Sequence, residues 1–296
     1  MYEKIEKCPI CSSEKIKNQQ LIKDFSITNE LFNISKCENC ELLFTNPRPD
    51  PENIGKYYAS KEYISHSNKP VNLIQYIYKL VRYFALRKKL NIINSLSKKG
   101  NILDFGCGTG HFLSTCQKDG WQISGFEPDN KANEIACMTT GTMIYKDILS
   151  VNTNQPYNVI TLWHVLEHLH DLNGTMNLLY SLLYKQGVLL VAVPNIKSYD
   201  SLLYKEYWAA WDVPRHLYHF SQKNIKDLAK KHKFKIKKIY PMKFDSYYVS
   251  YLSEYYKNNH NNLLGKYIYS IINGYKSNNK GKEAFEYSSL IYVLTK

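Results

Sequence analysis

The sequence predicts an α/β protein with a doubly wound, mostly parallel seven-stranded sheet and a small cysteine-rich unit ahead of it. Three observations support this fold class. From residue 101 onward, apolar strand-like segments alternate with helical segments, an order that places helices on both faces of a parallel sheet. A glycine-rich turn follows the first of these strands, and two Cys-x-x-Cys pairs precede the whole region. The 296 residues are sufficient for about two domains.

Four cysteines near the start of the chain have the spacing of a zinc ribbon. Cys8 and Cys11 form one Cys-x-x-Cys pair, Cys37 and Cys40 form the second, and 25 residues separate the pairs. Two thiolates of each pair can converge on one ion, so that two pairs complete a closed tetrahedral site for a structural Zn²⁺. Disulfides are the alternative, which a chain without a secretory leader disfavours. We expect a zinc-ribbon-like segment over 1–50 that ends in a proline-rich stretch.

The remaining chain divides into a helical segment and a larger domain. Apolar residues at helical spacing, from Leu73 to Phe84, predict a helical lead-in or lid within 51–98. The domain over 99–296 contains the alternating strands and an insertion at about 242–286, between the last two of them. The predicted strands cover residues 101–105, 121–127, 142–147, 157–163, 187–193, 234–239 and 288–294.

The turn after the first strand carries the strongest chemical signal. Gly106, Gly108 and Gly110 allow a tight turn into a helix and a close approach of the backbone to a ligand. Dinucleotide-binding enzymes use a similar turn, but the third glycine of their pattern would fall at His111. Asp104 would also place a negative charge next to a pyrophosphate. A cofactor with a sulfonium and an ammonium suits this acid better.

Acidic residues also end the next two predicted strands. Glu127 closes the second strand, where a carboxylate can accept hydrogen bonds from both hydroxyls of a ribose. Asp147 closes the third strand and is followed by Ile148, so that a polar group could bind an adenine amine beside an aliphatic side chain. Each acid alone is consistent with an ordinary strand end. Their order after the glycine-rich turn favours a cofactor site.

With these motifs the sequence resembles the class I S-adenosylmethionine-dependent methyltransferases over roughly residues 75–240, together with the last strand. The resemblance implies a Rossmann-like fold and S-adenosyl-L-methionine as the cofactor. Leu166-Glu-His168 is similar to a pattern common in small-molecule methyltransferases. The cysteine-rich start resembles bacterial methyltransferases found with surface-polysaccharide or secondary-metabolite genes, and sugar C-methyltransferases that carry a zinc domain. The implied cofactor-binding residues are Asp104, Gly106, Cys107, Gly108, Gly110, Glu127, Pro128, Asp147, Ile148, Trp163 and His164.

A loop rich in aromatic and charged residues follows the fifth strand, over 207–221. Loops at the carboxyl ends of parallel strands are where such folds place substrate-binding groups. Tyr207 and Trp211 are candidates for an apolar wall, and the guanidinium of Arg215 for binding a phosphate or carboxylate. Ordinary packing of the loop is the alternative. Ser221 has the position of an N-cap for the next helix.

Three histidines are candidates for a general base. Methyl transfer is an in-line displacement at a sulfonium, so the enzyme mainly aligns the acceptor and, where needed, removes its proton. Histidine titrates nearest to neutral pH. His216 is the first candidate, with His219 and His168 next, because all three lie on the side of the sheet to which the methyl group should point. If none is required, catalysis is by alignment alone.

The insertion and the net charge suggest further partners. Tyr247, Tyr251 and Tyr255 recur at helical spacing, which indicates packing against the sheet or a second subunit. Docking to a lipid-linked substrate or a membrane surface is the alternative. The formal net charge of +13 is compatible with nucleic acid, anionic lipid or anionic small molecules, although codon bias in an AT-rich genome would give the same composition.

The function expected is methyl transfer to a small-molecule or glycan- or lipid-precursor acceptor, on oxygen or carbon. A nucleic-acid (RNA) methyltransferase is the second candidate, disfavoured because the chain has neither an Asn-Pro-Pro-Tyr-type motif nor a Pro-Cys nucleophile. A non-catalytic cofactor-binding module is the third. No secretory leader and no apolar run of ~18 residues is present, so we expect a cytoplasmic protein. The sequence does not indicate an oligomeric state.

Overall fold

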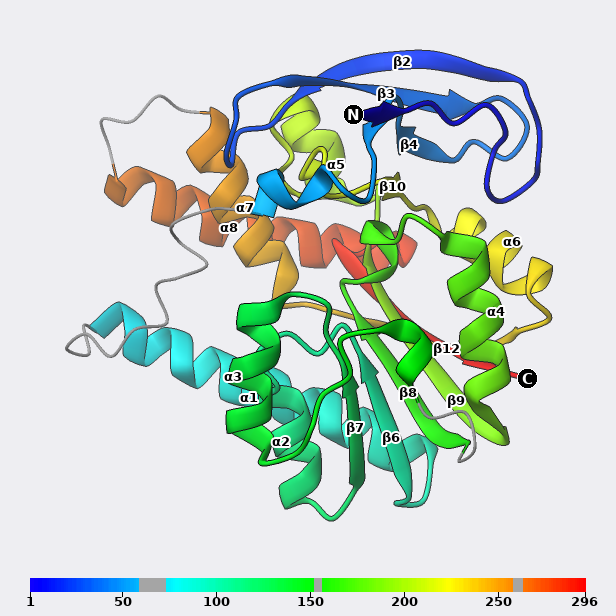
Figure 1. Ribbon diagram of the computed structural model, residues 1–296. Coiled ribbons are helices and arrows are strands. Elements are labelled where there is room, and N and C mark those ends of the chain that lie inside the picture. The colour runs from blue at the N-terminus through cyan, green and yellow to red at the C-terminus, as the bar shows by residue number, and fades with distance from the viewer. Residues whose placement is uncertain (59–72, 152–155, 258–262) are drawn as a thin grey trace.

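Six strands form the central sheet of the computed structural model, which describes residues 1–58, 73–151, 156–257 and 263–296 (Figure 1). Their order is β11-β12-β9-β8-β6-β7. The four strands from β9 to β7 are mutually parallel, whereas β12 is antiparallel to both β9 and β11. This confirms the predicted α/β class. The strands are β6 (Asn101–Phe105), β7 (Gln122–Phe126), β8 (Tyr157–Trp163), β9 (Leu183–Pro194), β11 (Lys235–Pro241) and β12 (Ser289–Thr295).

The seventh strand predicted over 142–147 does not form. This segment makes one isolated parallel bridge, between Phe126 and Tyr145. The next pair of backbone hydrogen bonds between the two segments does not form, because the backbone groups on the side of Glu127 and Asp129 have other partners. The Glu127 carbonyl accepts the side-chain amide of Asn133 at 3.1 Å, and the Asp129 N–H donates to the Glu127 carboxylate at 3.0 Å. The expected count of seven strands was therefore wrong by one.

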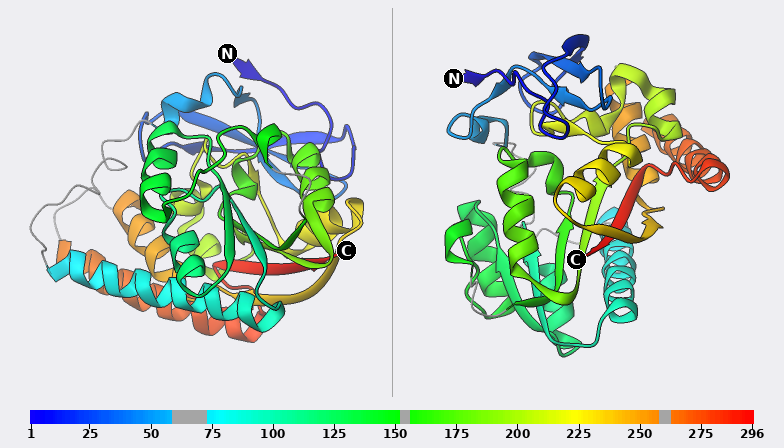
Figure 2. Two further views of the ribbon diagram at one scale, coloured as in Figure 1. Left: turned by 60° about the horizontal axis from the view of Figure 1, so that its bottom comes forward. Right: turned by 90° about the vertical axis from the view of Figure 1, so that its right-hand side faces the viewer.

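Helices cover both faces of this sheet. On one face, alternate strand residues such as Leu103, Ile160 and Leu189 pack against α4 and α6. On the other face, Ile102 and Val159 pack against α1 and α2. Figure 2 shows helices on either side of the strands. The helices are α1 (Leu73–Leu96), α2 (His111–Lys118), α3 (Asn130–Thr140), α4 (Leu172–Leu182), α5 (Tyr199–Tyr204), α6 (Gln222–Lys231), α7 (Asp245–Lys257) and α8 (Leu263–Ala284), with short 3-10 helices η1 (Ile54–Tyr58), η2 (Ile148–Ser150), η3 (Leu166–His168), η4 (Lys205–Tyr207) and η5 (Ala209–Trp211).

The cysteine-rich start of the chain forms a second sheet that includes a strand from much later in the sequence. Its order is β10-β4-β3-β2, and all pairs are antiparallel. This unit lies above one end of the central sheet (Figure 1, top). It shares one buried cluster with the central sheet, in which Cys8, Leu42 and Phe44 pack with sheet residues. The strands of this sheet are β2 (Ile16–Lys23), β3 (Leu31–Cys37), β4 (Leu43–Thr45) and β10 (Tyr218–His219). β1 (Tyr2–Glu3) and β5 (Arg48–Pro49) pair with each other in a separate two-stranded antiparallel sheet.

Two helices, α7 and α8, occupy the predicted insertion between β11 and β12 and pack closely on each other. α7 also contacts the segment of η4 and η5, which links the insertion to the loop after β9. Among the residues that the structure describes, no helix combines the length and apolar composition required to cross a membrane.

Candidate active site

The glycine-rich turn connects β6 to α2 and takes a backbone conformation that needs glycine. Gly106 and Gly108 have φ angles of +75° and +54°. A Cβ atom at Gly106 would lie 2.6 Å from Cγ2 of Val165, so the close approach of these two loops requires glycine there. A Cβ atom at Gly108 would meet nothing within 4 Å. The backbone of Gly108 is therefore open to a ligand.

Asp104 lies at the start of this turn and is almost completely buried. Thr161, its partner in register on β8, donates a 2.6 Å hydrogen bond from Oγ1 to the carboxylate. Burial raises the pKa of Asp104 to about 6, although Thr161 and the nearby Lys89 lower it. The Lys89 ammonium lies 4.3 Å from the centroid of the Trp163 ring. Burial lowers the pKa of Lys89, while Asp104 and Asp245 favour its charged form.

Glu127 reaches from the end of β7 to the glycine-rich turn. Its carboxylate accepts hydrogen bonds from the backbone N–H of Gly108 at 2.9 Å and of Asp129 at 3.0 Å. Burial raises its pKa, while these two hydrogen bonds oppose the shift. The structure thus brings Glu127 next to the open backbone of Gly108, from a position 19 residues later in the chain.

Asp147 and Ile148 lie where the isolated bridge ends. Asp147 is exposed, whereas Ile148 begins η2 and packs partly buried against the main core. Cys107 is buried with Ala136 in a small cluster behind the glycine-rich turn. Its side chain therefore supports the turn from the protein interior.

His164 follows β8 and joins two acidic residues. It has a positive φ of +58°, and its two ring nitrogens lie 3.2 Å from Glu167 Oε1 and 2.9 Å from Asp245 Oδ2. Burial alone would lower its pKa, but the hydrogen bonds to Asp245 and Glu167 raise it to about 10. An imidazolium at His164 thus holds the start of α7 against the end of β8.

His168 and His216 pack edge to face, and the buried carboxylate of Glu167 lies beside them. Because a carbonyl only accepts, Nδ1–H of His168 donates to the Arg215 carbonyl at 2.9 Å, and that of His216 to the Ala210 carbonyl at 2.8 Å. The two rings lie 4.7 Å apart. Nε2 of His216 is 4.0 Å from Glu167 Oε1. Glu167 Oε2 is buried and has no hydrogen-bond partner in the described part of the chain.

The segment that contains these groups matches a known protein family. Residues 76–239, more than half of the chain, match the family described as a methyltransferase domain. The chain belongs to the methyltransferase-domain family. This match covers the glycine-rich turn, Glu127, Glu167 and the three candidate histidines.

Solved structures with the same fold include S-adenosylmethionine-dependent methyltransferases. A SAM-dependent methyltransferase from Archaeoglobus fulgidus is 17% identical, with a TM-score of 0.51, over 73% of this chain and 94% of that chain. Magnesium protoporphyrin IX methyltransferase from Synechocystis PCC 6803, solved with bound SAH, is 13% identical, with a TM-score of 0.52, over 81% of this chain and 97% of that chain. No curated protein matched the sequence.

These findings confirm the predicted resemblance to class I S-adenosylmethionine-dependent methyltransferases, and with it the prediction of an enzyme. At such low identities the structural likeness concerns the fold.

The candidate acceptor-binding residues of the methyltransferase have different surroundings. Arg215 forms an ion pair with Asp212, and both lie close to His216. Tyr207 is half-buried, with its ring 5.6 Å from that of Phe25 of the first unit. Trp211 packs in a buried cluster and donates from its indole to the Lys205 carbonyl at 2.8 Å.

His219 and Ser221 lie further along the same loop. The His219 ring packs 4.7 Å from Trp211, and its Nε2 is buried without a hydrogen-bond partner in the described residues. Burial and the nearby His216 hold its pKa well below the usual range. The predicted N-cap at Ser221 is confirmed, since its side chain accepts from the Asn224 N–H within a capping box.

The four amino-terminal cysteines converge, as their spacing predicts. Their Sγ atoms all lie within 4.8 Å of one another, with 3.4 Å between Cys8 and Cys40 and 3.5 Å between Cys11 and Cys37. Tetrahedral zinc with Zn–S bonds of about 2.3 Å places its sulfurs about 3.8 Å apart. None of these cysteines is in a disulfide. The donor set therefore fits a structural zinc ion.

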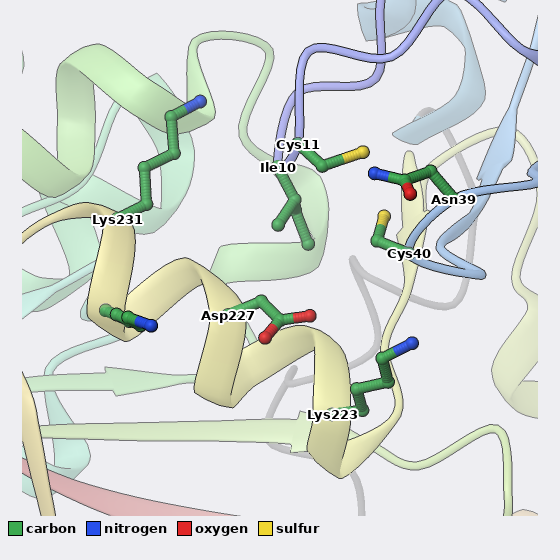
Figure 3. A pocket seen from close by; sticks show the side chains of 8 residues that line it. Ile10, Cys11, Asn39, Cys40, Lys223, Asp227 and Lys231 are labelled. Carbon is green, nitrogen blue, oxygen red and sulfur yellow. The ribbon is translucent and has the colours of Figure 1, made fainter.

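An open pocket of about 430 Å³ borders this cysteine cluster (Figure 3). Cys11, Asn39 and Cys40 lie on one side, and Lys223 and Asp227 of α6 lie on the other. None of the candidate cofactor or acceptor residues lines it. The pocket belongs to the junction between the first unit and α6.

Sequence reasoning missed Lys89, Thr161 and Asp245. Thr161 carried a detectable signal, because it is a polar residue inside an otherwise apolar strand. Lys89 and Asp245 carried none, because they reach the site from α1 and α7, far from the motifs in the sequence.

The His164 ion pairs predict a pH dependence of stability. Its pKa is about 10 in the folded chain and about 6.5 in an unfolded chain. The folded pKa is raised, so the contribution to stability is fully present below about pH 6.5 and is lost as the pH rises through about 10. We expect the free energy of unfolding to fall more over this range in the wild type than in His164→Gln. Denaturant titrations at several pH values measure both slopes, and equal slopes would contradict the assignment.

Proposed function

We propose that this methyltransferase transfers a methyl group from S-adenosyl-L-methionine to an oxygen or carbon of a small-molecule, glycan-precursor or lipid-linked acceptor. The observation that carries the proposal is the group formed by Glu167, His168 and His216. One carboxylate oxygen of Glu167 is buried without a hydrogen-bond partner in the described part of the chain, and Nε2 of His216 lies 3.7 Å from Asp212 Oδ2 and 4.0 Å from Glu167 Oε1. A buried group of this kind calls for a ligand, and a polar acceptor would supply the missing donor.

The cofactor would be held by the carboxyl ends of β6, β7 and β8. Asp104 would pair with its ammonium, the open backbone of Gly108 would lie next to it, and Glu127 would accept the hydroxyls of its ribose. Lys89, which is enclosed beside Trp163, would face its carboxylate. The other proposed contacts come from Gly106, Cys107, Gly110, Pro128, Asp147, Ile148, Trp163 and His164.

The bound cofactor supplies an electrophilic methyl group, and the chain's own residues would align the acceptor and take its proton. His216 donates Nδ1–H to a backbone carbonyl, which leaves the lone pair of its neutral ring on Nε2. Removal of a proton by this atom would create an imidazolium 3.7 Å from Asp212 Oδ2 and 4.0 Å from Glu167 Oε1. Both carboxylates would stabilise that charge. His168 and His219 are the next candidates.

The acceptor would be held by the loop after β9. Arg215 is available to an anionic group if its ion pair with Asp212 opens or is shared. Tyr207 and Trp211 would form the apolar side. These aromatic residues pack with the first unit and with α7, so the acceptor site would include parts of the chain on both sides of the methyltransferase domain.

We also propose that Cys8, Cys11, Cys37 and Cys40 hold one structural zinc ion. The supporting observation is the convergence of four thiols, three of them buried, with no disulfide among them. Four protein ligands leave no open coordination position, so the ion would stabilise the first unit and take no part in the chemistry.

Replacement of Glu127 tests the cofactor site. Glu127→Ala is expected to weaken binding of S-adenosylmethionine by ~1–3 kcal/mol, because charged hydrogen bonds to the ribose are lost. Isothermal titration calorimetry measures the affinity, and Glu134→Ala, an exposed glutamate on α3, is the control. Unchanged affinity in Glu127→Ala would remove the ribose assignment.

Replacement of His216 tests the proposed base. His216→Gln retains a side-chain donor for the Ala210 carbonyl, and we expect the rate to fall ~10²–10⁴-fold while cofactor affinity stays near the wild-type value. Initial rates with an accepted substrate provide the measurement, and His232→Gln at the end of α6 is the control. Normal turnover by both His216→Gln and His219→Gln would show that alignment alone suffices.

Metal analysis tests the cysteine site. The purified chain is expected to contain about one zinc ion, and Cys37→Ser should lose it and unfold at lower denaturant concentration. Cys137→Ser, at a half-buried thiol outside the cluster, should keep the metal. A metal-free wild-type chain with four reactive thiols would refute the assignment.

A further inference from the structure

Helix α8 exposes large apolar residues between 267 and 275 and buries a stripe of small and polar residues. Ser270, Ser277 and the side chain of Lys266 are at most 5% exposed, and the buried stripe also contains Gly274 and Gly281. A surface helix of a globular protein normally shows the reverse pattern. The exposed large residues, here called the α8 face, are Tyr267 (40%), Ile268 (48%), Tyr269 (58%), Ile271 (60%), Ile272 (41%) and Tyr275 (60%).

This orientation of α8 is fixed by close packing. A Cβ atom at Gly274 would lie 2.6 Å from the Tyr247 ring on α7, so the two helices approach too closely for a larger residue. Ser277 donates a 2.6 Å hydrogen bond to the buried carboxylate of Asp200. Rotation of α8 to bury its isoleucines would break both contacts. The apolar face is therefore held outward.

Further aromatic residues extend the α8 face onto α7. The Tyr251 ring stacks on Tyr267 at 5.2 Å, and Tyr255, which is 47% exposed, lies 5.2 Å from the ammonium of Lys266. α1 lies on the same side of the molecule and exposes Tyr83 and Phe84 (Figure 2, right). A cluster of exposed large apolar side chains of this kind marks an interaction site.

The exposed charges around this surface are mostly positive. α1 contains no acidic residue and exposes Arg87 and Lys88, whereas its Lys89 is enclosed beside Trp163. α8 exposes Lys276 and Lys282, and its one glutamate, Glu283, pairs with Lys280. Two copies of such a surface would bring basic helices together and repel each other. Tyrosines beside lysines on an apolar face are typical of proteins that lie in the headgroup region of an anionic bilayer.

We propose that the α8 face docks on an anionic membrane surface, with Ile268, Ile271, Ile272 and Tyr275 entering the headgroup region. The membrane would present a lipid-linked acceptor to the site, and in this respect the inference rests on the proposed function. Docking itself is independent of turnover. Methyl transfer to a water-soluble acceptor without vesicle binding would overturn the docking and leave the proposed function in place.

Co-sedimentation of the full chain with lipid vesicles tests the docking. We expect binding to phosphatidylcholine vesicles with about 30 mol% phosphatidylglycerol at ~50 mM salt, and much weaker binding to pure phosphatidylcholine or at ~500 mM salt. Ile271→Glu should lower the partition coefficient about tenfold or more, because a charge would enter the apolar contact. Met138→Glu on α3, where the side chain is 77% exposed, should bind like the wild type.

Three results would overturn the proposal. They are absence of wild-type binding to anionic vesicles, equal binding of Ile271→Glu and the wild type, or a wild-type dimer that Ile271→Glu dissociates without any vesicle binding. Circular dichroism and denaturant unfolding of Ile271→Glu establish that the exposed substitution leaves the fold intact.

Discussion

The position of His216 depends on a short antiparallel contact between two distant parts of the chain. Thr45 at the end of β4 donates its side-chain hydroxyl to the His216 carbonyl at 2.8 Å and its N–H to the Leu217 carbonyl at 3.0 Å. The Leu217 N–H in turn donates to the Glu167 carbonyl at 2.8 Å. The first unit is thus joined to the segment after β8 through the backbone of His216 and Leu217. The unit that carries the cysteine cluster therefore contacts the segment that contains the candidate base.

The same contacts bring several charged groups together where three loops meet. His164 and Glu167 come from the end of β8, Asp212 and His216 from the loop after β9, and Asp245 from α7. A buried charged group needs an oppositely charged partner or a bound ligand, because burial of an isolated charge costs free energy. Most are paired in this structure. The exception in the described residues is one oxygen of Glu167, which has no hydrogen-bond partner there.

The sequence predicts those parts of the molecule whose determinants are local. Alternating apolar segments predict β6 and β8 to the residue, and the glycine pattern locates the turn at Gly106. The missing strand at 142–147 depended on side-chain hydrogen bonds of Asn133 and Glu127, which no periodicity reveals. Lys89 and Asp245 reach the site only through tertiary packing. The sequence likewise did not predict that α8 turns its isoleucines outward. The face that α8 buries is set by its contacts with Tyr247 and Asp200, which the composition of the helix does not show.

The sheet order also determines when the fold can close during synthesis. β12 lies between β9 and β11 and supplies the antiparallel partner for both. Until β12 emerges from the ribosome, the edge of β9, with its run from Val188 to Val193, remains unpaired, and β11 cannot join the sheet at all. An open apolar edge of this kind is a template for wrong pairing between chains. The nascent protein would therefore be most prone to aggregation in the interval after β9 has been made and before β12 has been.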